Sequence, residues 1–578
     1  MTEAVAAPAD TTKVDAAFAA VSDACAQRGI VVTRVASATP QYLDVEMVGA
    51  TQTWSLGVDC AMKYLRLPGV WTKPPTSPLA HVSWGGSVCI DDGQGLSLDP
   101  DRRAEVTAYA VLKAYDLLEN SARDAATGYT EFFNELEGYW LLLPSSLRTR
   151  AYFEVDGRSR MVRGFANLRQ KQPTWYFVER DGDKPWDVKE GQLQTHRALY
   201  VHLEALDLPP VSPNKLTSDF VEEVHRRLSP EQLDLWGQLV GSSKNAPKQL
   251  ALLVSIARQA GGRSLVGVAF GARGGVLDKK VPVTPLTMRR HAPSYMRERG
   301  GALMELYGKH VAVLGAGAVG SVVIDTLAAA GVGKLTVVDT DDYSSDNVFR
   351  HILEPWLVDV PKVHGLKHTL ERRYPGLRVI PVHDVAQDWL HKFDLHQYDG
   401  IVVAFGDPSV ERSFSRVLKN PRYDLPVVFT WLEALDLGGH SVLMWTKGEG
   451  CLDCVYRDDE GQPSQASRTA FLEPNQPVTR NLTGCSGSFV PYGPIQARRT
   501  GLVAAEHLLL AMTAALSGDG PREPSYRFWV GEGRAAAERG LRTTPWFQAA
   551  RTTLPEDATR QVFGRPCRRC RTPQEPTP

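Results

Sequence analysis

The sequence predicts an α/β protein with a mostly parallel sheet in its C-terminal half, preceded by an α+β domain and a small α/β linker domain. From residue 308 onward, apolar strand-like runs alternate with helix-like segments, which is typical of parallel sheets. Earlier residues instead predict a helix, alternating strands, a long loop and a second helix. A chain of 578 residues is also too long for one core. We expect domains at residues 13–140, 141–285 and 286–578.

The composition is that of an ordinary globular protein, with 43% hydrophobic and 23% charged residues. The formal net charge of −1 gives no electrostatic reason to expect nucleic acid or an anionic membrane as a partner. The N-terminus does not resemble a secretory signal, and no run reaches the length of a membrane span. We therefore expect a cytoplasmic protein that binds neither nucleic acid nor membrane.

The first domain is predicted from helical spacing and from period-two alternation. Residues 13–29 carry apolar positions at helical spacing and end on Gly29, and the stretches IVVTRVAS, YLDVEMV and TWSLGV alternate as strands do. A Pro/Gly-rich segment that contains Cys89 follows, and residues 101–121 predict the second helix.

The linker domain and the C-terminal domain differ in the order of their elements. In the linker, ALYVHLEAL and LVGVAF predict strands, whereas SDFVEEVHRRL and PKQLALLVSIARQA (residues 247–260) predict helices. The C-terminal domain predicts a βαβαβ order through HVAVLGAGAVGSVVIDTLAAAG, KLTVVD, a helix near 361–373, RVIPV and DGIVVAF.

A glycine loop follows the first strand of the C-terminal domain, with Gly315, Gly317 and Gly320 in G-x-G-x-x-G spacing. Such glycines permit a tight strand-to-helix turn, and the helix start offers N–H groups and a positive dipole to phosphate. The loop alone also fits an NAD(P)-dependent oxidoreductase. Asp339, after the next strand, does not discriminate, because an acid there binds ribose in either class.

Three later residues favour ATP over a dinucleotide. Arg350 and Lys362 follow where cations would neutralise a triphosphate, and Asp407 follows a further apolar strand, placed to hold Mg²⁺. Hydride transfer needs none of the three. Taken singly, Arg350 and Lys362 are equally explained as surface charges and Asp407 as a turn residue, so the ordered set carries the prediction.

The string from Val311 to Lys362, together with Asp407, resembles the adenylation domain of the ThiF/MoeB and ubiquitin-activating superfamily. Members adenylate the C-terminal glycine carboxylate of a small β-grasp protein. The resemblance implies that Asp339 binds ribose and that Asp341 and Asp407 serve Mg²⁺ and the reaction centre. It implies phosphate contacts for Asn347, Arg350 and Lys362.

The same resemblance implies a homodimer in which one copy lends an arginine to the other. Arg290, Arg297 and Arg299 precede the first strand of the domain at a suitable place, and the sequence does not choose between them.

Four of the eight cysteines form two C-x-x-C pairs, Cys451/Cys454 and Cys567/Cys570. This spacing suits a tetrahedral Zn²⁺ site, and MoeB-like proteins have pairs similarly far apart in sequence. Separate redox pairs are the alternative.

Two isolated cysteines are candidate nucleophiles. Cys485 lies in a Gly/Ser-rich loop, NLTGCSGSF, where the activating enzymes carry the cysteine that accepts the acyl group as a thioester. The alternative for Cys485 is a packed thiol.

Cys89 lies in HVSWGGSVCIDDG, within residues 15–140, which loosely resemble the ubiquitin-conjugating fold. There is no His-Pro-Asn box, so His81, Asp91 and Asp92 are candidates for assisting a lysine nucleophile. A core cysteine at a strand end is the alternative.

The combination resembles the single-chain activating and conjugating enzymes of bacterial antiphage (CBASS) islands. That resemblance implies adenylation with ATP and Mg²⁺, transfer through Cys485 to Cys89, and isopeptide formation on the lysine of a target. The implied partner is a ubiquitin-like protein or the C-terminus of a cGAS-like nucleotidyltransferase. The alternatives are a sulfur-carrier-protein adenylyltransferase, which would not need Cys89, and an oxidoreductase, which would need neither nucleophile.

Overall fold

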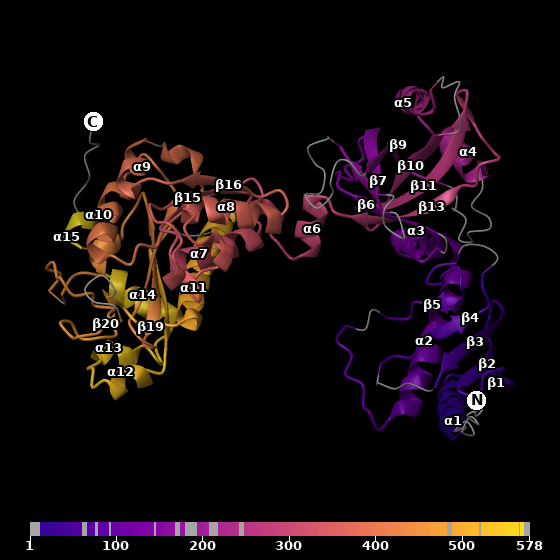
Figure 1. Cartoon of the computed structure of the whole chain (residues 1–578). Coiled ribbons are helices and arrows are strands. Elements are labelled where there is room, and N and C mark those ends of the chain that lie inside the picture. The colour runs from indigo at the N-terminus through magenta and orange to yellow at the C-terminus, as the bar shows by residue number, and fades with distance from the viewer. Residues whose placement is uncertain are drawn as a thin grey trace, which may run out of the picture. The chain divides into compact units, whose positions relative to one another are not determined.

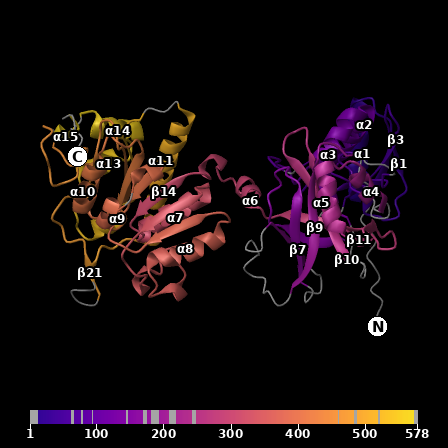
Figure 2. The same ribbon diagram turned by 90° about the horizontal axis from the view of Figure 1, so that it is seen from above.

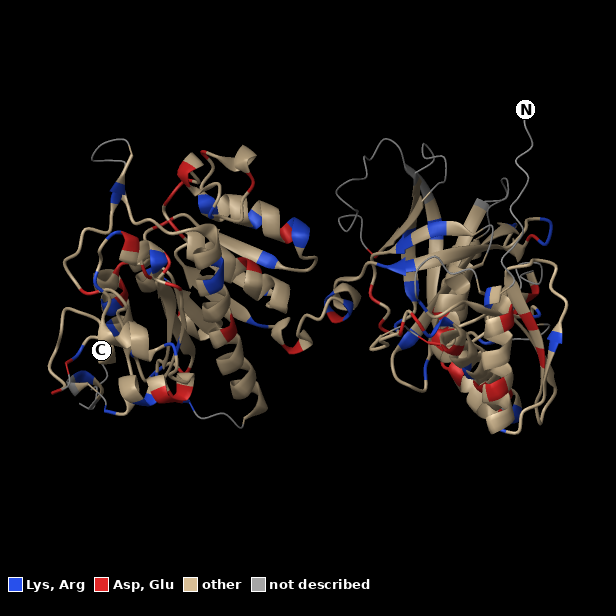
Figure 3. Cartoon of the chain, turned by 90° about the horizontal axis from the view of Figure 1, so that it is seen from below, with Lys and Arg blue, Asp and Glu red and all other residues tan. Residues whose placement is uncertain are grey.

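The computed structural model describes residues 12–60, 66–75, 79–91, 94–143, 146–167, 174–179, 193–206, 218–241, 248–392, 394–458, 460–482, 488–518, 522–565 and 567–571. The chain divides into two compact units, Met1–Ala292 and Pro293–Pro578 (Figure 1). Basic and acidic residues both occur on each unit (Figure 3), in keeping with the net charge of −1.

The first unit begins with an antiparallel sheet in the order β1-β2-β3-β4-β5. Alternate residues of β2 and β3, such as Leu43, Val45 and Leu56, are buried, as the period-two pattern predicts. Helices α1 (Thr12–Gln27) and α2 (Arg103–Arg123) complete this core, which confirms the predicted order of elements. The strands are β1 (Val32–Val35), β2 (Tyr42–Val48), β3 (Thr53–Asp59), β4 (Val70–Thr72) and β5 (Ser87–Val88).

Seven further strands close into a ring, because β10 pairs with β9 on one side and with β11 on the other. Phe177, Tyr200 and Leu253 belong to the core inside this ring. Neighbouring strand residues such as Leu199 and Leu252 belong to a separate core on its outer face. The ring runs β10-β9-β7-β8-β6-β13-β11, with β12 (Val276–Leu277) paired to β11. Its strands are β6 (Leu147–Ala151), β7 (Arg160–Asn167), β8 (Thr174–Val178), β9 (Leu193–Leu203), β10 (Lys248–Ala257), β11 (Arg263–Arg273) and β13 (Thr284–Arg290).

Three helices cover part of the outer face of the closed sheet: α3 (Ala125–Leu141), α4 (Ser218–Arg226) and α5 (Pro230–Val240). The helix predicted over residues 247–260 is wrong, because these residues contain strand β10. Leu252 and Val254 pack outward under the helices while Ala251 and Leu253 pack inside the ring. A strand that is buried on both faces has a continuous run of apolar residues, and the spacing of apolar residues in such a run does not distinguish a strand from a buried helix.

The second unit is built on a seven-stranded sheet in the order β16-β15-β14-β17-β18-β19-β22. The first five strands are parallel, as predicted, and β19 and β22 are antiparallel additions. The mixed α/β class predicted for the chain is thereby confirmed. The strands are β14 (His310–Leu314), β15 (Lys334–Val338), β16 (Arg378–Val382), β17 (Gly400–Val403), β18 (Pro426–Leu432), β19 (Gly438–Trp445) and β22 (Ser525–Val530).

Helices cover both faces of this sheet (Figures 1 and 2). Val311 and Val313 of β14 pack with α7, α8 and α11, whereas Ala312 and Leu314 pack on the opposite face with α9, α10 and α14. The helices are α7 (Ala318–Ala330), α8 (Lys362–Arg373), α9 (Ala386–Lys392), α10 (Pro408–Leu418), α11 (Pro494–Ser517) and α14 (Pro555–Phe563). With both faces covered, the carboxyl ends of the parallel strands are where a ligand would bind.

Short elements complete the described chain. They are α6 (Pro293–Arg299), α12 (Arg534–Glu538), α13 (Pro545–Ala549), α15 (Arg568–Arg571), the hairpin β20 (Arg480–Asn481) with β21 (Ser488–Phe489), and 3₁₀ turns η4 (Met304–Leu306), η5 (Ser345–Asn347), η6 (Pro355–Leu357), η7 (Leu395–Gln397) and η8 (Leu452–Cys454).

Among the described residues, α11 alone has the length and apolar composition of a membrane span. Its Ala504, Ala505 and Leu508 are fully buried in the core shared with α7 and β14. These contacts account for its apolar sequence as that of a core helix, and the prediction of a protein without membrane contact stays a prediction.

Helix α3 is fixed to the closed sheet by a partly buried ion pair between Glu137 and Arg290, whose Nη2 also donates to the carbonyl of Arg263. Replacing Glu137 by Ala leaves the guanidinium without its carboxylate, so we expect a loss of about 3 kcal/mol in stability. Urea-dependent hydrogen exchange of β11 peptides measures this loss. Glu105→Ala, which removes an exposed partner of Arg102, is the control, and equal effects of the two variants would contradict the prediction.

Candidate functional site

In the turn between β14 and α7, two backbone segments approach so closely that there is no room for a side chain between them. A Cβ on Gly320 would lie 1.9 Å from the carbonyl oxygen of Gly315, and Gly315 has a φ of +92°. Gly317 precedes α7 without capping it by a side chain, and a Cβ there would meet nothing within 4 Å. The first N–H groups of α7 therefore remain available to an anion.

Two buried polar groups fasten this turn. Asp339 accepts the N–H of Ala316 at 2.6 Å and that of Asp341 at 2.8 Å. His351 donates from Nε2 to the carbonyl of Ala316 at 2.8 Å, while its Nδ1 accepts the N–H of Leu353. Burial lowers the pKa of His351 to about 4, so the ring is neutral at pH 7. His351 lies within the string from Val311 to Lys362, but the sequence alone predicted no role for it.

A cavity of about 340 Å³ lies beside the glycine turn, at the carboxyl ends of β14 and β15. Gly315, Gly317, Asp339, Asp341 and Lys362 all line it, so the fold collects five of the predicted residues. Lys362 is 5% exposed at the start of α8, and its ammonium lies 2.6 Å from Asp341 and 3.9 Å from Asp339. The predicted residues thus give the cavity anion-binding N–H groups, one buried cation and two of its three carboxylates.

The lining also includes Asp384 and Gln387, which the sequence did not single out. They follow β16, the third parallel strand, so their position relative to the strand ends is the signal that would have found them.

The other predicted nucleotide residues lie outside the described lining of this cavity. Asn347 and Arg350 belong to the segment that ends at His351, and the Arg350 guanidinium stacks 4.7 Å from the ring centre of Tyr492. Asp407 caps α10, accepting the N–H groups of Ser409 and Val410. Val410 itself lines the cavity.

Four cysteines that are remote in sequence meet on one side of the second unit. The sulfur atoms of Cys451, Cys454, Cys567 and Cys570 lie within 4.8 Å of one another. Cys451 Sγ is 3.7 Å from Cys567 Sγ and 3.3 Å from Cys570 Sγ, and Cys454 Sγ is 3.9 Å from Cys570 Sγ. Four sulfurs bound at 2.3 Å around a tetrahedral ion would lie about 3.8 Å apart, so the set fits zinc.

Three basic side chains and one carboxylate lie next to the cluster. Asp453, between the first two cysteines, pairs with Arg412 and Arg416 at 2.9 and 2.8 Å. The buried ammonium of Lys419 donates to the carbonyls of Trp445 and Gly450. Burial lowers the pKa of Lys419, and the nearby cysteines oppose that effect, as thiolates would.

The two candidate nucleophiles stand differently. Cys485 lies outside the described residues, between the paired strands β20 and β21. Cys89 is exposed, and its N–H donates to the carbonyl of His81 at 2.8 Å. Of the three residues predicted to assist it, His81 is therefore its neighbour and Asp91 is two residues away, while Asp92 lies outside the described residues.

The three candidate arginines are also distinguished. Arg290 pairs with Glu137, and Arg297 is buried, donating to the carbonyl of Gly331 at 2.6 Å and stacking on Tyr307. Arg299, at the end of α6, is exposed. Of the three, only Arg299 has a side chain that is exposed and for which no such contact is described.

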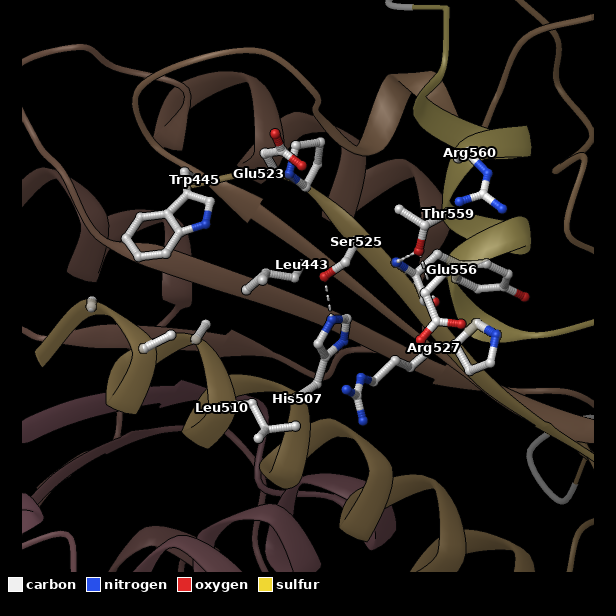
Figure 4. Close-up of a pocket in the computed structure, with 16 residues that line it drawn as sticks. Leu443, Trp445, His507, Leu510, Glu523, Ser525, Arg527, Glu556, Thr559 and Arg560 are labelled. Carbon is white, nitrogen blue, oxygen red and sulfur yellow. Dashed lines mark hydrogen bonds between the residues drawn. The ribbon is translucent and has the colours of Figure 1, made fainter. Parts of the chain in front are cut away.

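A second cavity, of about 400 Å³, lies between β19, β22, α11 and α14 (Figure 4). Both ring nitrogens of His507 are hydrogen-bonded, Nδ1 to the hydroxyl of Ser441 at 2.8 Å and Nε2 to that of Ser525 at 2.7 Å. Burial lowers the pKa of His507 to about 3, so it is neutral. This cavity shares no described lining residue with the one at the glycine turn.

Residues 292–528, nearly all of them in the second unit, match the model of the ThiF family. The ATP-dependent ubiquitin transferase-like protein Cap2 of Pseudomonas aeruginosa (strain BWHPSA011 / Pa011) is 28% identical over 220 residues, 36% of this chain and 37% of that protein. Cap2 of Enterobacter hormaechei subsp. hoffmannii (strain UCI 50) is 28% identical over 153 residues, 26% of each chain. The predicted resemblance to the ThiF superfamily and to the antiphage enzymes is thereby confirmed.

A third relative is the adenylyltransferase and sulfurtransferase UBA4 of Yarrowia lipolytica (strain CLIB 122 / E 150), 33% identical over 79 residues. These residues are 14% of this chain and 20% of that protein. The chain thus spans between 20% and 37% of the length of these three relatives.

The four-cysteine cluster predicts one tightly held zinc ion per chain. Replacing both Cys451 and Cys567 by Ala should abolish binding and release the C-terminal segment, because two ligands cannot hold the ion in a folded site. Metal analysis by mass spectrometry and limited proteolysis measure the two effects. Cys25→Ala, at a buried cysteine of the first unit, is the control, and stoichiometric zinc in the double variant would contradict the assignment.

Proposed function

We propose that this chain uses ATP to adenylate the C-terminal carboxylate of a partner protein and then conjugates that carboxylate to a lysine. The observation that carries the proposal is the cavity at the glycine turn, where Lys362, Asp339 and Asp341 meet the uncapped start of α7. The ThiF-family match over this segment, and the similarity to Cap2, an ATP-dependent ubiquitin transferase-like protein, support it. We place the activity in bacterial antiphage defence, as part of the same proposal.

In this scheme, each of the predicted nucleotide residues contacts a different part of the nucleotide. The α7 N–H groups and Lys362 bind phosphate, and Asp339 binds ribose with the acceptor capacity left beside its two N–H partners. Lys362 then exchanges Asp341 for phosphate. Asp341 and Asp407 would hold Mg²⁺, which supplies positive charge against the triphosphate. Asn347 and Arg350 reach the phosphates when the Arg350 side chain leaves Tyr492.

Each chemical step is a substitution with a defined leaving group. A partner carboxylate oxygen attacks the α-phosphorus and expels pyrophosphate. The Cys485 thiolate attacks the acyl-adenylate and expels AMP, and the Cys89 thiolate takes the acyl group from Cys485. A lysine amine finally attacks the thioester, and the Cys89 sulfur leaves as the isopeptide forms.

The partner we propose is a ubiquitin-like protein or the C-terminus of a cGAS-like nucleotidyltransferase. We also propose a homodimer, in which Arg299 is the arginine lent to the neighbouring copy. Its exposure at the end of α6 supports this choice, since Arg290 and Arg297 are held by other groups.

A sulfur-carrier-protein adenylyltransferase is the second candidate, favoured by the similarity to UBA4. It would use the same cavity and cysteine cluster, and it would leave Cys89 without a role. An oxidoreductase is disfavoured, because the buried Lys362 paired with two carboxylates has no task in hydride transfer.

Replacing Lys362 by Ala should lower the rate of ATP–pyrophosphate exchange by roughly 100-fold, because one fixed cation is lost from the phosphate site. The measurement is incorporation of labelled pyrophosphate into ATP in the presence of candidate β-grasp partners. Lys367→Ala on the same helix, which loses an ion pair with Glu371 and a hydrogen bond to the carbonyl of Val379 but no cavity group, should exchange normally. An equal loss in both variants would sink the assignment of Lys362.

Replacing Cys485 by Ala should abolish every DTT-sensitive adduct with the partner, because the relay starts there. Replacing Cys89 by Ala should leave the adduct on Cys485 and abolish conjugation. Non-reducing electrophoresis with and without DTT separates these outcomes. A conjugate formed by Cys89→Ala would refute the relay, and pyrophosphate exchange without any adduct would favour sulfur transfer.

A further inference from the structure

Helix α3 presents three polar side chains on one face. Glu131, Glu135 and Tyr139 are four residues apart, a spacing that aligns them along the helix. Another face is fastened to the closed sheet, where Trp140 Nε1 donates to the carbonyl of Gly267 and Ser264 Oγ donates to that of Phe133. The polar face is therefore held in place by the fold of the closed sheet.

The segment that carries Cys89 docks on this face. His81 has a φ of +63°, a conformation that costs a non-glycine residue about 1 kcal/mol or more. Its N–H donates to the Tyr139 hydroxyl at 2.6 Å, and its carbonyl accepts the N–H of Cys89 at 2.8 Å. Tyr139 thus holds the backbone of His81 through its N–H, while the carbonyl of the same residue holds the N–H of Cys89.

The His81 ring lies between two carboxylates. Nδ1 is 3.1 Å from Glu135 and Nε2 is 3.2 Å from Glu131, and the Tyr139 hydroxyl donates to Glu135. The hydrogen bond to Glu135 raises the pKa of His81 against its partial burial, and the hydrogen bond to Glu131 and the two charges add to that effect. Both ring nitrogens donate only in the imidazolium, which is the form this arrangement favours.

Cys89 also acts electrostatically on Tyr139. Burial raises the pKa of Tyr139, its hydrogen bond to Glu135 and the charge of Glu135 add to the increase, and Cys89 contributes a smaller increase. In the described part of the chain, the His81 ring contacts Glu131 and Glu135, its N–H donates to Tyr139, and its carbonyl accepts the N–H of Cys89.

We propose that Glu131, Glu135 and Tyr139 are positioning residues of the Cys89 site, keeping His81 charged and its peptide left-handed beside the thiol. The inference rests on the proposed function for the acyl group that Cys89 carries. A lysine amine attacking that thioester forms a C–N bond, negative charge develops on the carbonyl oxygen, the C–S bond breaks, and the amine proton leaves with the sulfur. The imidazolium, held through both N–H groups by Glu131 and Glu135, keeps the His81 peptide and its hydrogen bond to the Cys89 N–H in place while the amine attacks. With both nitrogens donating, His81 is not the base that takes the proton.

The first test needs no partner. Histidine C2–H exchange, read by mass spectrometry across pH on the full chain, gives the titration midpoint of His81. We expect it above the ordinary value of 6.5 in the wild type and lower in Glu135→Gln and in Glu131→Gln. Glu105→Gln, at an exposed glutamate of α2, should leave it unchanged. An ordinary midpoint that Glu135→Gln does not move would overturn the inference.

The second test reads the chemistry. Wild-type and Glu135→Gln chains charged at Cys89 are discharged to a lysine amide in single turnovers across pH. Between the two His81 midpoints the wild-type ring is charged and the variant ring neutral, so the rate ratio should peak there, at about tenfold. A ratio that does not change with pH would show a merely structural role and defeat the inference. If no chain can be charged at Cys89, the proposed function fails and the exchange measurement alone decides the network.

Discussion

The close approach of α7 to the end of β14 is the constraint on which the nucleotide cavity depends. With Gly320 against the carbonyl of Gly315, the helix start opens directly onto the strand ends, and Gly317 leaves the space above it clear. Asp339 and neutral His351 hold the loop from two sides, and Lys362 closes the opposite wall. A side chain at Gly320 would force the helix away and separate these groups, because the atom it would meet is the backbone carbonyl oxygen of Gly315, which cannot rotate aside as a flexible side chain can.

The chemistry proposed for the two units is divided between them. The second unit holds the cavity and a cysteine cluster that ties residues 567–571 to the segment after β19. The first unit holds the exposed Cys89. Helix α3, which lies next to the Cys89 segment, is attached to the closed sheet by a hydrogen bond from Trp140 and the ion pair between Glu137 and Arg290. The closed sheet therefore has a definite task in this account: it fixes the acid pair and the tyrosine that surround His81.

Much of the second unit could be predicted because its strands are short, mostly apolar and separated by clear helices, as at 310–338. Each C-x-x-C pair could be recognised from its spacing, which is a local property, whereas the joining of two pairs 116 residues apart was implied only by the resemblance to MoeB-like proteins. Strand β10 was mistaken for a helix because burial on both faces removes alternation. The network around His81 was out of reach, since Glu131, Glu135 and Tyr139 meet it only through tertiary packing 50 to 58 residues away. Asp407 stays a prediction: its place after a strand suggests a metal ligand, and in the structure its carboxylate caps α10.

The central claim is that the glycine-turn cavity directs a carboxylate to the α-phosphate of ATP. Labelling the C-terminal carboxylate of a candidate partner with ¹⁸O and analysing the nucleotide product by mass spectrometry tests it directly. After the adenylate is cleaved, AMP should carry one ¹⁸O, because the attacking oxygen stays on the α-phosphorus. Unlabelled AMP, or label in inorganic phosphate together with ADP, would contradict the account.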